Sequence, residues 1–256
     1  MSMLSVHGLT KRFGGLTAVD GLSLDVFEGT IHAVIGPNGA GKSTVFNLLT
    51  GFDKPDSGTV TFEGRPLTGL RPHEIVRRGM ARTFQNTQLF DEMSVLDNVL
   101  VGAYTRTSVG LVRAALRLPG VRAEEELARE EAHRLLRVVG LDEEASSLAG
   151  DLPHGSRRLV ELARCLAGTP RLILLDEPAA GLNGVETGWL GETLRRVCGT
   201  GVTLVVVEHD MGLVMGISDA VVVLSEGRKI AEGPPYLIQK DPAVIEAYLG
   251  EARADA

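Results

Sequence analysis

The segment GPNGAGKST, Gly36 to Thr44, carries the clearest chemical pattern in the sequence. It fits the spacing G-x-x-x-x-G-K-[ST] and lies between a predicted strand, Thr30 to Ile35, and a predicted helix, Ser43 to Leu49. Glycines let the backbone turn its N–H groups toward an anion, and the start of a helix adds partial positive charge. We therefore predict that Lys42 reaches the β- and γ-phosphates of a nucleotide and that Ser43 binds Mg²⁺. The alternative, a plain glycine turn with an exposed lysine, leaves the strand–helix context unexplained.

A pair of acids supports this prediction. The run RLILLDEP predicts a buried strand that ends in Asp176 and Glu177. At a strand end, Asp176 suits a contact to Mg²⁺ through water, and Glu177 suits the γ-phosphate side, where its carboxylate can polarise an attacking water. Two acids at a strand end could also simply face solvent, but that interpretation is weak beside a phosphate-binding loop.

An unusual helix start occurs in LPHGSRRLVELARCLAG, Leu152 to Gly168. Apolar residues recur at helical spacing, and Gly168 and Pro170 end the helix. A helix start normally attracts Asp or Glu, yet here the first turn holds Arg157 and Arg158. Three interpretations are open. The helix start meets an anion from another molecule, the arginines hold acidic groups on its flank, or both arginines are simply solvated.

Three further residues are ambiguous when each is taken alone. His209 follows the apolar run TLVVVE, just past a predicted strand end. Gln85 follows MARTF, and Phe13 lies in KRFGG. A lone histidine is more often structural or solvated than catalytic. The glutamine and the phenylalanine could equally be a loop residue and a core residue.

The composition of the chain limits these interpretations. With 256 residues the chain can form one large domain or two small ones, and its net charge of −7 disfavours non-specific binding to nucleic acid. Two scattered cysteines, Cys165 and Cys198, predict neither a disulfide nor a zinc framework and indicate a reducing compartment. The first residues lack the apolar core of a signal peptide. Apolar runs such as Val202 to Val207 are too short to cross a bilayer, so any membrane role is expected to come through a partner.

The elements that must position these residues change character along the chain. Short β-like runs with glycine turns fill the opening third, and strand and helix alternate again after residue 150. Between them, Ser94 is expected to cap a helix, and Arg122 to Val139 to form an amphipathic helix. The residues of that helix expected to face a core are Leu127, Leu135, Leu136 and Val139. A final helix is expected from Asp241-Pro242 to near Gly250.

Several segments, in order, make the chain resemble the ATP-binding subunit of an ATP-binding cassette (ABC) transporter. They are GPNGAGKST, Gln85, LPHGS, LILLDEP, AGLN and His209. The resemblance spans nearly the whole chain. The segments FGGLTAVDGLSL, ARTFQNTQLFDEMSVLDNV and DEPAAGLN are similar to the ATP-binding subunits of branched-chain amino acid importers.

This resemblance implies a fold and a domain organisation. We expect an α/β fold: a P-loop NTPase core with a mainly parallel sheet, an N-terminal antiparallel β subdomain and an inserted α-helical subdomain. The expected unit is a single ABC ATPase domain over 1–256. Residues 1–92 and 150–256 would form the core with the antiparallel β subdomain, and residues 93–149 would form the helical subdomain.

The resemblance also implies roles for individual residues, with ATP and Mg²⁺ as the bound species. Phe13 would stack on adenine, Glu177 would be the general base, and His209 would contact the γ-phosphate. Gln85 would sense Mg²⁺ and γ-phosphate and link to the permease. The residues expected to bind ATP are Phe13, Gly36, Pro37, Asn38, Gly39, Ala40, Gly41, Lys42, Ser43 and Thr44, and those expected to hold the metal are Ser43, Gln85 and Asp176.

The family further implies partners. Two ATP-binding subunits, identical or paralogous, would face each other head to tail. Each nucleotide would lie between the phosphate loop of one and the signature segment of the other. Since LPHGS takes the signature position, Gly155 and Ser156 would contact the partner's nucleotide, together with Asn183 of AGLN. Two membrane permease subunits, docked on the helical block, and an external substrate-binding protein complete the expected assembly. No nucleic acid is expected among the partners. The chain would lie at the cytoplasmic face of the cell membrane.

The chain departs from the family's usual signature LSGGQ. Pro153 stands in the place of the serine, His154 in that of the first glycine and Ser156 in that of the glutamine, and Asn183 replaces a usual aspartate. These departures bear on the contacts across the dimer more than on the ATP site itself.

Two alternative functions follow from the same resemblance. One is an ABC ATPase without a transport role. Its chromosome-maintenance form needs a long coiled coil between Gln85 and the signature, and residues 86–151 show no sustained heptads; its translation form carries two cassettes in one chain. The other is a regulatory subunit with little turnover, against which Lys42, Glu177 and His209 argue.

Overall fold

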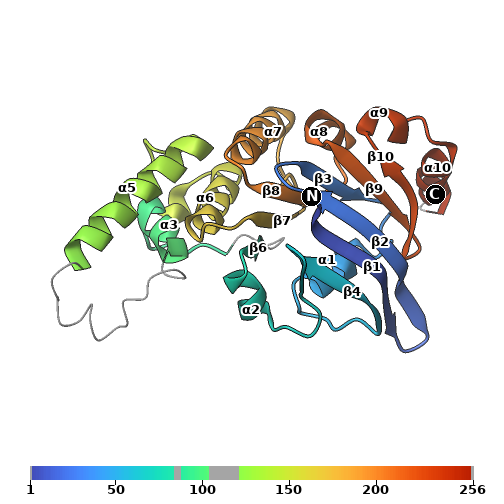
Figure 1. Ribbon diagram of the computed structural model, residues 1–256. Coiled ribbons are helices and arrows are strands. Elements are labelled where there is room, and N and C mark those ends of the chain that lie inside the picture. Colours follow the sequence, from blue (N-terminus) through green and yellow to red (C-terminus); the bar gives the residue numbers. More distant parts are fainter. Residues whose placement is uncertain (1, 84–87, 104–120, 255–256) are drawn as a thin grey trace. The chain divides into compact units, whose positions relative to one another are not determined.

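The computed structural model describes residues 2–83, 88–103 and 121–254, and the chain divides into two compact units (Figure 1). The first unit comprises Met1–Arg82, Arg171–Ala180 and Val197–Ala256, and the second comprises Thr83–Pro170 and Gly181–Arg196. The expected boundaries of a helical subdomain at 93–149 stay a prediction.

The first unit contains all the strands of the described chain. The strands are β1 (Ser2–Phe13), β2 (Leu16–Phe27), β3 (Ile31–Ile35), β4 (Ser57–Phe62), β5 (Arg65–Pro66), β6 (Met80–Arg82), β7 (Leu172–Asp176), β8 (Thr203–Val207), β9 (Ala220–Ser225) and β10 (Arg228–Gly233). Its helices are α1 (Lys42–Leu49), α2 (Pro72–Arg77), α8 (Met211–Ile217), α9 (Pro235–Ile238) and α10 (Pro242–Ala254).

Six strands form a sheet in the order β10-β9-β3-β8-β7-β6. All neighbouring pairs are parallel except β9 and β10. Every residue of β3, β7 and β8 is buried, as expected for central parallel strands that carry apolar runs. The expected α/β fold with a mainly parallel sheet is therefore confirmed. The carboxyl ends of these strands point to one edge, where ligands bind in sheets of this kind.

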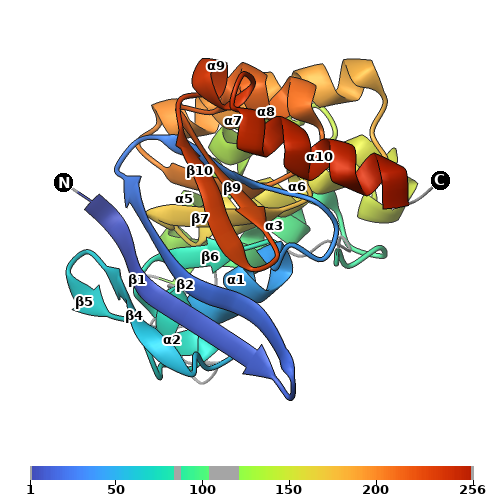
Figure 2. The same cartoon turned by 90° about the vertical axis from the view of Figure 1, so that its right-hand side faces the viewer.

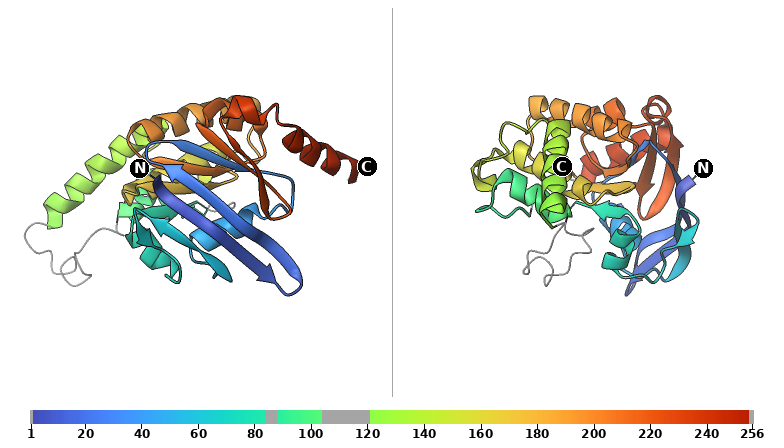
Figure 3. Two further views of the ribbon diagram at one scale, coloured as in Figure 1. Left: turned by 45° about the vertical axis from the view of Figure 1, so that its right-hand side comes forward. Right: turned by 60° about the vertical axis from the view of Figure 1, so that its left-hand side comes forward.

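The four remaining strands form an antiparallel sheet in the order β2-β1-β4-β5. Strands β1 and β2 make a long twisted ribbon, drawn in dark blue in Figure 3. This sheet confirms the N-terminal antiparallel β subdomain that the family resemblance implied. Its ribbon brings Phe13, at the end of β1, next to Leu16, at the start of β2.

Alternate residues of the six-stranded sheet point into two cores, because successive side chains of a strand face opposite sides. Val34 joins one core with α1 and the antiparallel sheet. Ala33 and Ile35 join the other with α8, α9 and α10. Figure 2 shows the resulting layers of the first unit. Helix α1, which follows the phosphate loop, is thereby fixed between two sheets.

The second unit is helical. Its elements are α3 (Val95–Ala103), α5 (Val121–Val139), a 3₁₀ turn (Ala149–Asp151), α6 (His154–Ala167) and most of α7 (Gly184–Gly199). Helix α6 packs against both α3 and α5. Gly102 permits the close approach of α3, since a Cβ there would lie 2.0 Å from the carbonyl oxygen of Arg164.

Two predictions about these helices meet different outcomes. Ser94 caps α3 as predicted: its Oγ accepts from the Asp97 N–H at 3.0 Å and donates to the Asp97 carboxylate at 2.6 Å. The prediction that Leu127 faces a core is wrong, because it is 65% exposed, whereas Leu135, Leu136 and Val139 are buried. The helical spacing is right, but Leu127 lies a full two turns before these residues.

The final helix also differs from its prediction. It begins at Pro242 as expected but continues past Gly250 to Ala254. A single glycine inside a helix costs only about 1 kcal/mol relative to alanine, so it does not have to end one. Among the residues that the structure describes, no helix has both the length and the apolar character to span a membrane.

Candidate functional site

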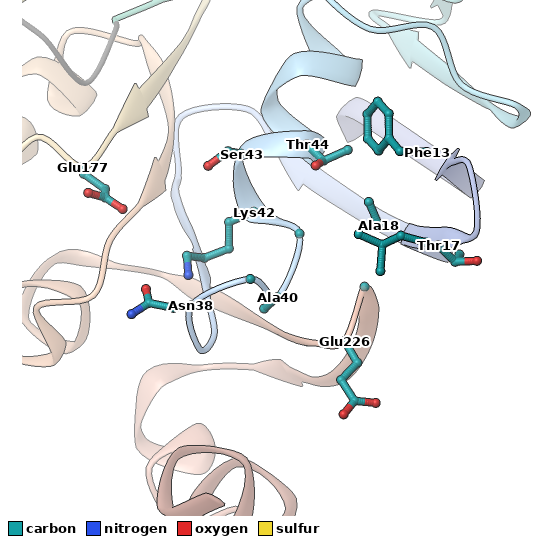
Figure 4. Close-up of a pocket in the computed structure, with 14 residues that line it drawn as sticks. Phe13, Thr17, Ala18, Asn38, Ala40, Lys42, Ser43, Thr44, Glu177 and Glu226 are labelled. Atoms are coloured by element: carbon teal, nitrogen blue, oxygen red, sulfur yellow. The ribbon is translucent and has the colours of Figure 1, made fainter. Parts of the chain in front are cut away.

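A pocket of about 680 Å³ opens beside the phosphate loop in the first unit (Figure 4). This volume lies within the range of small-molecule sites. The residues that line it are Phe13, Leu16, Thr17, Ala18, Asn38, Gly39, Ala40, Gly41, Lys42, Ser43, Thr44, Glu177, Glu226 and Gly227. Three features predicted from distant parts of the sequence, an aromatic ring, a phosphate loop and a carboxylate, thus line one cavity.

Glycine is required at both ends of the loop. Gly36 has φ 150°, and a Cβ there would lie 2.1 Å from the Leu224 carbonyl oxygen. Gly41 has φ 98°, and its Cβ would lie 2.4 Å from the Ala18 carbonyl oxygen. Both positions combine positive φ with a close backbone approach, so only glycine fits without displacement. Gly36 and Pro37 shape the loop but do not line the pocket.

Lys42 closes the loop on itself. Its Nζ donates to the carbonyl oxygens of Gly36 at 2.7 Å and Pro37 at 2.9 Å. In Figure 4 the amine points toward the side of the pocket where Asn38 and Glu177 lie. The ammonium group is therefore held at the mouth of the loop, where an anion bound by the loop would meet a fixed positive charge.

The start of α1 faces the pocket with Ser43 and Thr44 (Figure 4). The first turn holds no acid, and Gly41 precedes it without a capping side chain. The N–H groups at a helix start have no partner within the helix and carry partial positive charge. The helix start therefore suits a bound phosphate, and the Ser43 hydroxyl suits a metal beside it.

The two acids after β7 take different positions. Asp176 is buried, and its Oδ2 accepts from the Arg82 guanidinium at 2.7 Å. Glu177 lines the pocket on the side of Lys42 opposite to Phe13 (Figure 4). Its backbone has φ 47°, a left-handed conformation that is unfavourable for a non-glycine residue. The turn that presents Glu177 is therefore held by its surroundings rather than by local preference.

The three individually ambiguous residues have different outcomes. Phe13 lies at the rim, 47% exposed, with Lys11 Nζ 5.1 Å from its ring centroid. It is not a core residue, and about half of its surface is exposed to contact a planar group. His209 lies two residues after the end of β8, and its side chain is 64% exposed. Gln85, predicted to be catalytic and to sense the metal, lies outside the described residues.

The signature segment begins α6 in the second unit, with Pro153 at the N-cap position and no capping side chain. Gly155 and Ser156 lie in the first turn. The Glu186 carboxylate stands close by, since a Cβ on Gly155 would lie 3.1 Å from Glu186 Oε1. Arg157 donates to Asp91 at 2.6 Å and to the Ala149 carbonyl oxygen at 3.0 Å. Of the three interpretations, Arg157 follows the second, in which it holds an acid on the flank.

Asn183, predicted to contact the partner's nucleotide, caps α7. Its Oδ1 accepts from the N–H groups of Val185 at 2.9 Å and Glu186 at 3.1 Å. Glu186 in turn accepts from the Asn183 N–H at 2.9 Å. This reciprocal arrangement is a capping box. Asn183 is itself exposed, at the N-terminal end of α7.

The residues proposed to hold Mg²⁺ fit the chemistry of that ion. Mg²⁺ in nucleotide sites takes one or two protein oxygens, phosphate oxygens and water. Ser43 Oγ and the Asp176 carboxylate supply such oxygens. The described part of the chain holds no group of three His, Cys, Asp or Glu side chains that could form an all-protein metal site. Because two protein oxygens leave most Mg²⁺ coordination positions to phosphate oxygens and water, a metal here would bind together with the nucleotide.

Sequence reasoning missed several residues of this site. The pocket is also lined by residues from the start of β2 and from the turn between β9 and β10, namely Leu16, Thr17, Ala18, Glu226 and Gly227. Arg82 and Glu208 contact the predicted residues or their backbone. Glu208 does have a signal in the sequence, since it is an acid directly after an apolar run. Its burial could not be read from the sequence, because acids are rarely buried.

Comparison with known proteins places these features in context. A family model described as ABC transporter matches residues 19–180, and one described as branched-chain amino acid ATP-binding cassette transporter matches residues 228–254. The chain is 46% identical to the high-affinity branched-chain amino acid transport ATP-binding protein BraF of Pseudomonas aeruginosa, over 98% of each chain. It is 45% identical to LivG of Escherichia coli, which carries the same description, again over 98% of each chain.

Solved structures agree with the fold. The crystal structure of an ATP-binding cassette of an ABC transporter in its ADP conformation has a TM-score of 0.86 and 34% identity, covering 98% of this chain and all of the other. A dimeric ATP-binding cassette in a post-hydrolysis state, bound to ADP and Pi, has a TM-score of 0.75 and 25% identity, covering 91% of this chain and 99% of the other.

Proposed function

Because this chain belongs to the ABC transporter family, we propose that it is the subunit that hydrolyses Mg²⁺-bound ATP to power an importer of branched-chain amino acids. One observation carries the chemical part of this proposal. Phe13, the phosphate loop and Glu177 line a single pocket, in that order along its length. The substrate class rests on relatives that are 45–46% identical over 98% of the chain and are described as branched-chain amino acid transport proteins.

The pocket residues contact different parts of ATP. Phe13 stacks on the adenine, since its exposed ring lies at the pocket rim. The loop from Gly36 to Thr44 surrounds the phosphates with backbone N–H groups, and Lys42 neutralises charge on the β- and γ-phosphates. Ser43 would hold Mg²⁺ directly and Asp176 would hold it through water, and the metal would neutralise charge on the phosphoryl group being transferred.

Glu177 accepts the proton of the attacking water at its carboxylate. A base must lie near the γ-phosphate, and Glu177 lines the pocket on the Lys42 side (Figure 4). His209, exposed at the end of β8, contacts the γ-phosphate once the site closes. Gln85 follows β6 and is proposed to link metal and γ-phosphate to the permease.

Assembly completes the site. A second ABC ATPase subunit, a paralogue or a copy of this chain, is proposed to face this one head to tail. The start of α6, with Gly155 and Ser156, then meets the γ-phosphate held by the partner, and Asn183 lies nearby. The dimeric cassette bound to ADP and Pi, which is similar in fold, supports this arrangement. Two permease subunits and an external substrate-binding protein complete the importer, with this chain peripheral at the cytoplasmic face of the membrane.

The two alternatives have less support. If the chain were a non-transport ATPase or a weakly active regulatory subunit, its full-length similarity to high-affinity transport ATP-binding proteins would be unexplained. A regulatory role also leaves unexplained the coincidence of Lys42 and Glu177 in one pocket.

Reconstitution tests this proposal. Proteoliposomes would contain the permease pair, this chain and its partner ATPase, with ATP inside and the binding protein and labelled leucine outside. We expect leucine uptake that needs ATP and Mg²⁺ and is lost with Lys42→Ala, while labelled lysine is not taken up. Equal uptake of leucine with and without ATP, or with Lys42→Ala, would refute the transport role.

A further inference from the structure

Glu208 is a buried carboxylate to which neither the sequence patterns nor the family resemblance assigned a role. It lies between the end of β8 and His209, and its side chain has no exposed surface. Burial of a carboxylate is unfavourable unless charge-assisted hydrogen bonds offset the lost hydration. The groups that donate to Glu208 therefore indicate what it holds in place.

Its two oxygens accept from two separate segments of backbone. Oε1 accepts from the Ala179 N–H at 2.6 Å, and Oε2 accepts from the His209 N–H at 3.0 Å and the Asp210 N–H at 3.4 Å. Ala179 lies two residues after Glu177. One side chain thus joins the segment that carries the proposed base to the segment that carries the proposed γ-phosphate contact.

The segment after β7 needs such support. Glu177 has φ 47°, which is unfavourable for a residue with a Cβ and persists only where neighbours enforce it. The Glu177 N–H donates to the Val207 carbonyl oxygen at 2.9 Å, directly before Glu208. The end of β8 therefore holds the turn at two points, one through backbone and one through the Glu208 side chain.

We infer that Glu208 is a positioning residue that fixes the backbone of Glu177 and that of His209 relative to each other. This inference rests on the proposed function, in which both side chains act at the γ-phosphate. A shift of about 1 Å at a reacting group can reduce a rate by about 10²-fold, so a tether between the two segments affects turnover more than nucleotide binding. Glu208 itself touches neither nucleotide nor water in this role.

The tether requires a carboxylate. Glu208→Gln keeps the size of the side chain but replaces one acceptor oxygen with an NH₂ group, which would face a backbone N–H on one of the two sides. One segment is then released, whichever way the amide turns. Glu208→Asp keeps both acceptors and the charge but withdraws them by one methylene.

The test compares turnover, affinity and backbone protection in the assembled transporter and the single chain. For Glu208→Gln we expect kcat for ATP to fall by about 10- to 100-fold, with the ATP KM and the affinity of the single chain unchanged within about twofold. Amide hydrogen exchange at Ala179 or at His209, whichever segment the amide releases, should accelerate by at least about tenfold. If Glu208→Gln does not fold, Glu208→Asp should show the same pattern to a smaller extent.

A matched control lies at the other end of the same strand. Thr203 is buried, and its Oγ1 accepts from the Gly29 N–H at 2.9 Å. Thr203→Val removes the buried acceptor of a partly buried hydrogen bond to the Gly29 backbone without changing side-chain shape, so it reproduces the loss of a side-chain tether at the same strand. We expect Thr203→Val to keep wild-type kcat. Equal losses of kcat in Glu208→Gln and Thr203→Val would assign Glu208 a merely structural role and overturn the inference.

A double variant separates this inference from the proposed function. In a Glu177→Gln background, Glu208→Gln should reduce the residual rate by a smaller factor than in the otherwise wild-type chain, because one of the two groups it positions is already gone. Wild-type kcat in Glu208→Gln, with turnover abolished by Glu177→Gln, would overturn the inference alone. Full turnover in Glu177→Gln would overturn the proposed role of the base, and unchanged amide exchange at Ala179 and His209 in Glu208→Gln would then overturn the tether as well.

Discussion

The Arg82 guanidinium donates to the Asp176 carboxylate across neighbouring strands, with 2.7 Å between Arg82 Nη2 and Asp176 Oδ2. Both side chains are about nine-tenths buried. Arg82 also donates through Nη1 to Asn47 at 2.8 Å and Thr50 at 3.2 Å, which lie at the end of α1. The carboxylate proposed to hold the metal is thus connected to the helix that follows the phosphate loop.

Replacement of Arg82 should affect both stability and the metal. Removing one partner of a buried ion pair typically destabilises a protein by about 3–5 kcal/mol, so Arg82→Met should lower the free energy of urea unfolding by an amount of this order. ATP affinity measured with Mg²⁺ should fall, while affinity measured in EDTA should not. Arg171→Met, which alters a half-exposed arginine with exposed partners, is the control and should cost about 1 kcal/mol or less. Equal losses of ATP affinity with Mg²⁺ and in EDTA would show that Arg82 does not act through the metal site.

The signature segment can be tested at Gly155. Gly155→Asp adds an anion where a partner's γ-phosphate is proposed to arrive. We expect wild-type ATP affinity in the single chain but loss of dimerisation and of most turnover in the assembled transporter. Since any Cβ here also lies 3.1 Å from Glu186 Oε1, Gly155→Ala is needed to measure the effect of crowding alone. Normal turnover in Gly155→Asp would mean that this segment only begins a helix.

Nucleotide-dependent pairing gives a third prediction. If each nucleotide fills a gap between two subunits, the chain with Glu177→Gln should dimerise with ATP, with itself or with a paralogue, because hydrolysis no longer reopens the pair. Size-exclusion chromatography with ATP, with ADP and without nucleotide provides the measurement. Only the ATP sample should show the dimer. The same dimer fraction in ATP and ADP, with every partner tested, would contradict the proposed sandwich.

His32 gives a prediction about pH. It is 3% exposed, and burial lowers its pKa from the ordinary value of 6.5, although Glu232 and Asp219 oppose this shift. The unfolded chain therefore takes up a proton near pH 6.5 while the folded chain does not, so stability should decline as pH falls below 6.5, by at most about 1.4 kcal/mol per pH unit from this group.

Urea unfolding at pH 7.5, 6.5 and 5.5 measures this effect. His32→Gln should show a shallower loss of stability with falling pH than wild type, whatever its stability at pH 7.5. His73 is exposed, so His73→Gln is the control. Its change of unfolding free energy with pH should match that of wild type. Identical slopes for His32→Gln and wild type would show that another group causes the pH dependence.

The parts of the site that could be predicted are those that the sequence encodes locally. The phosphate loop is one continuous segment whose glycines, lysine and flanking strand and helix are all visible in sequence. Asp176 and Glu177 were equally visible, because an apolar run followed by acids marks the end of a buried strand. The central strands β3, β7 and β8 were predictable for the same reason.

The parts that could not be predicted depend on strand order and tertiary contact. Arg82 meets Asp176 only because β6 pairs with β7, and Arg157 meets Asp91 across 66 residues of sequence. Glu208 reaches Ala179 because β7 and β8 are neighbours. The prediction that Leu127 faces a core was wrong for a related reason. A helical pattern gives the face on which a residue lies but not where along the helix the core ends.

Phosphate release by Glu177→Gln tests the central claim most directly. In the assembled transporter with Mg²⁺ and ATP, we expect the variant to bind ATP as wild type does but to release phosphate about 10²- to 10⁴-fold more slowly, the usual contribution of a general base. Wild-type phosphate release in Glu177→Gln would contradict the assignment of Glu177 as the base and, with it, the account of ATP hydrolysis in this pocket.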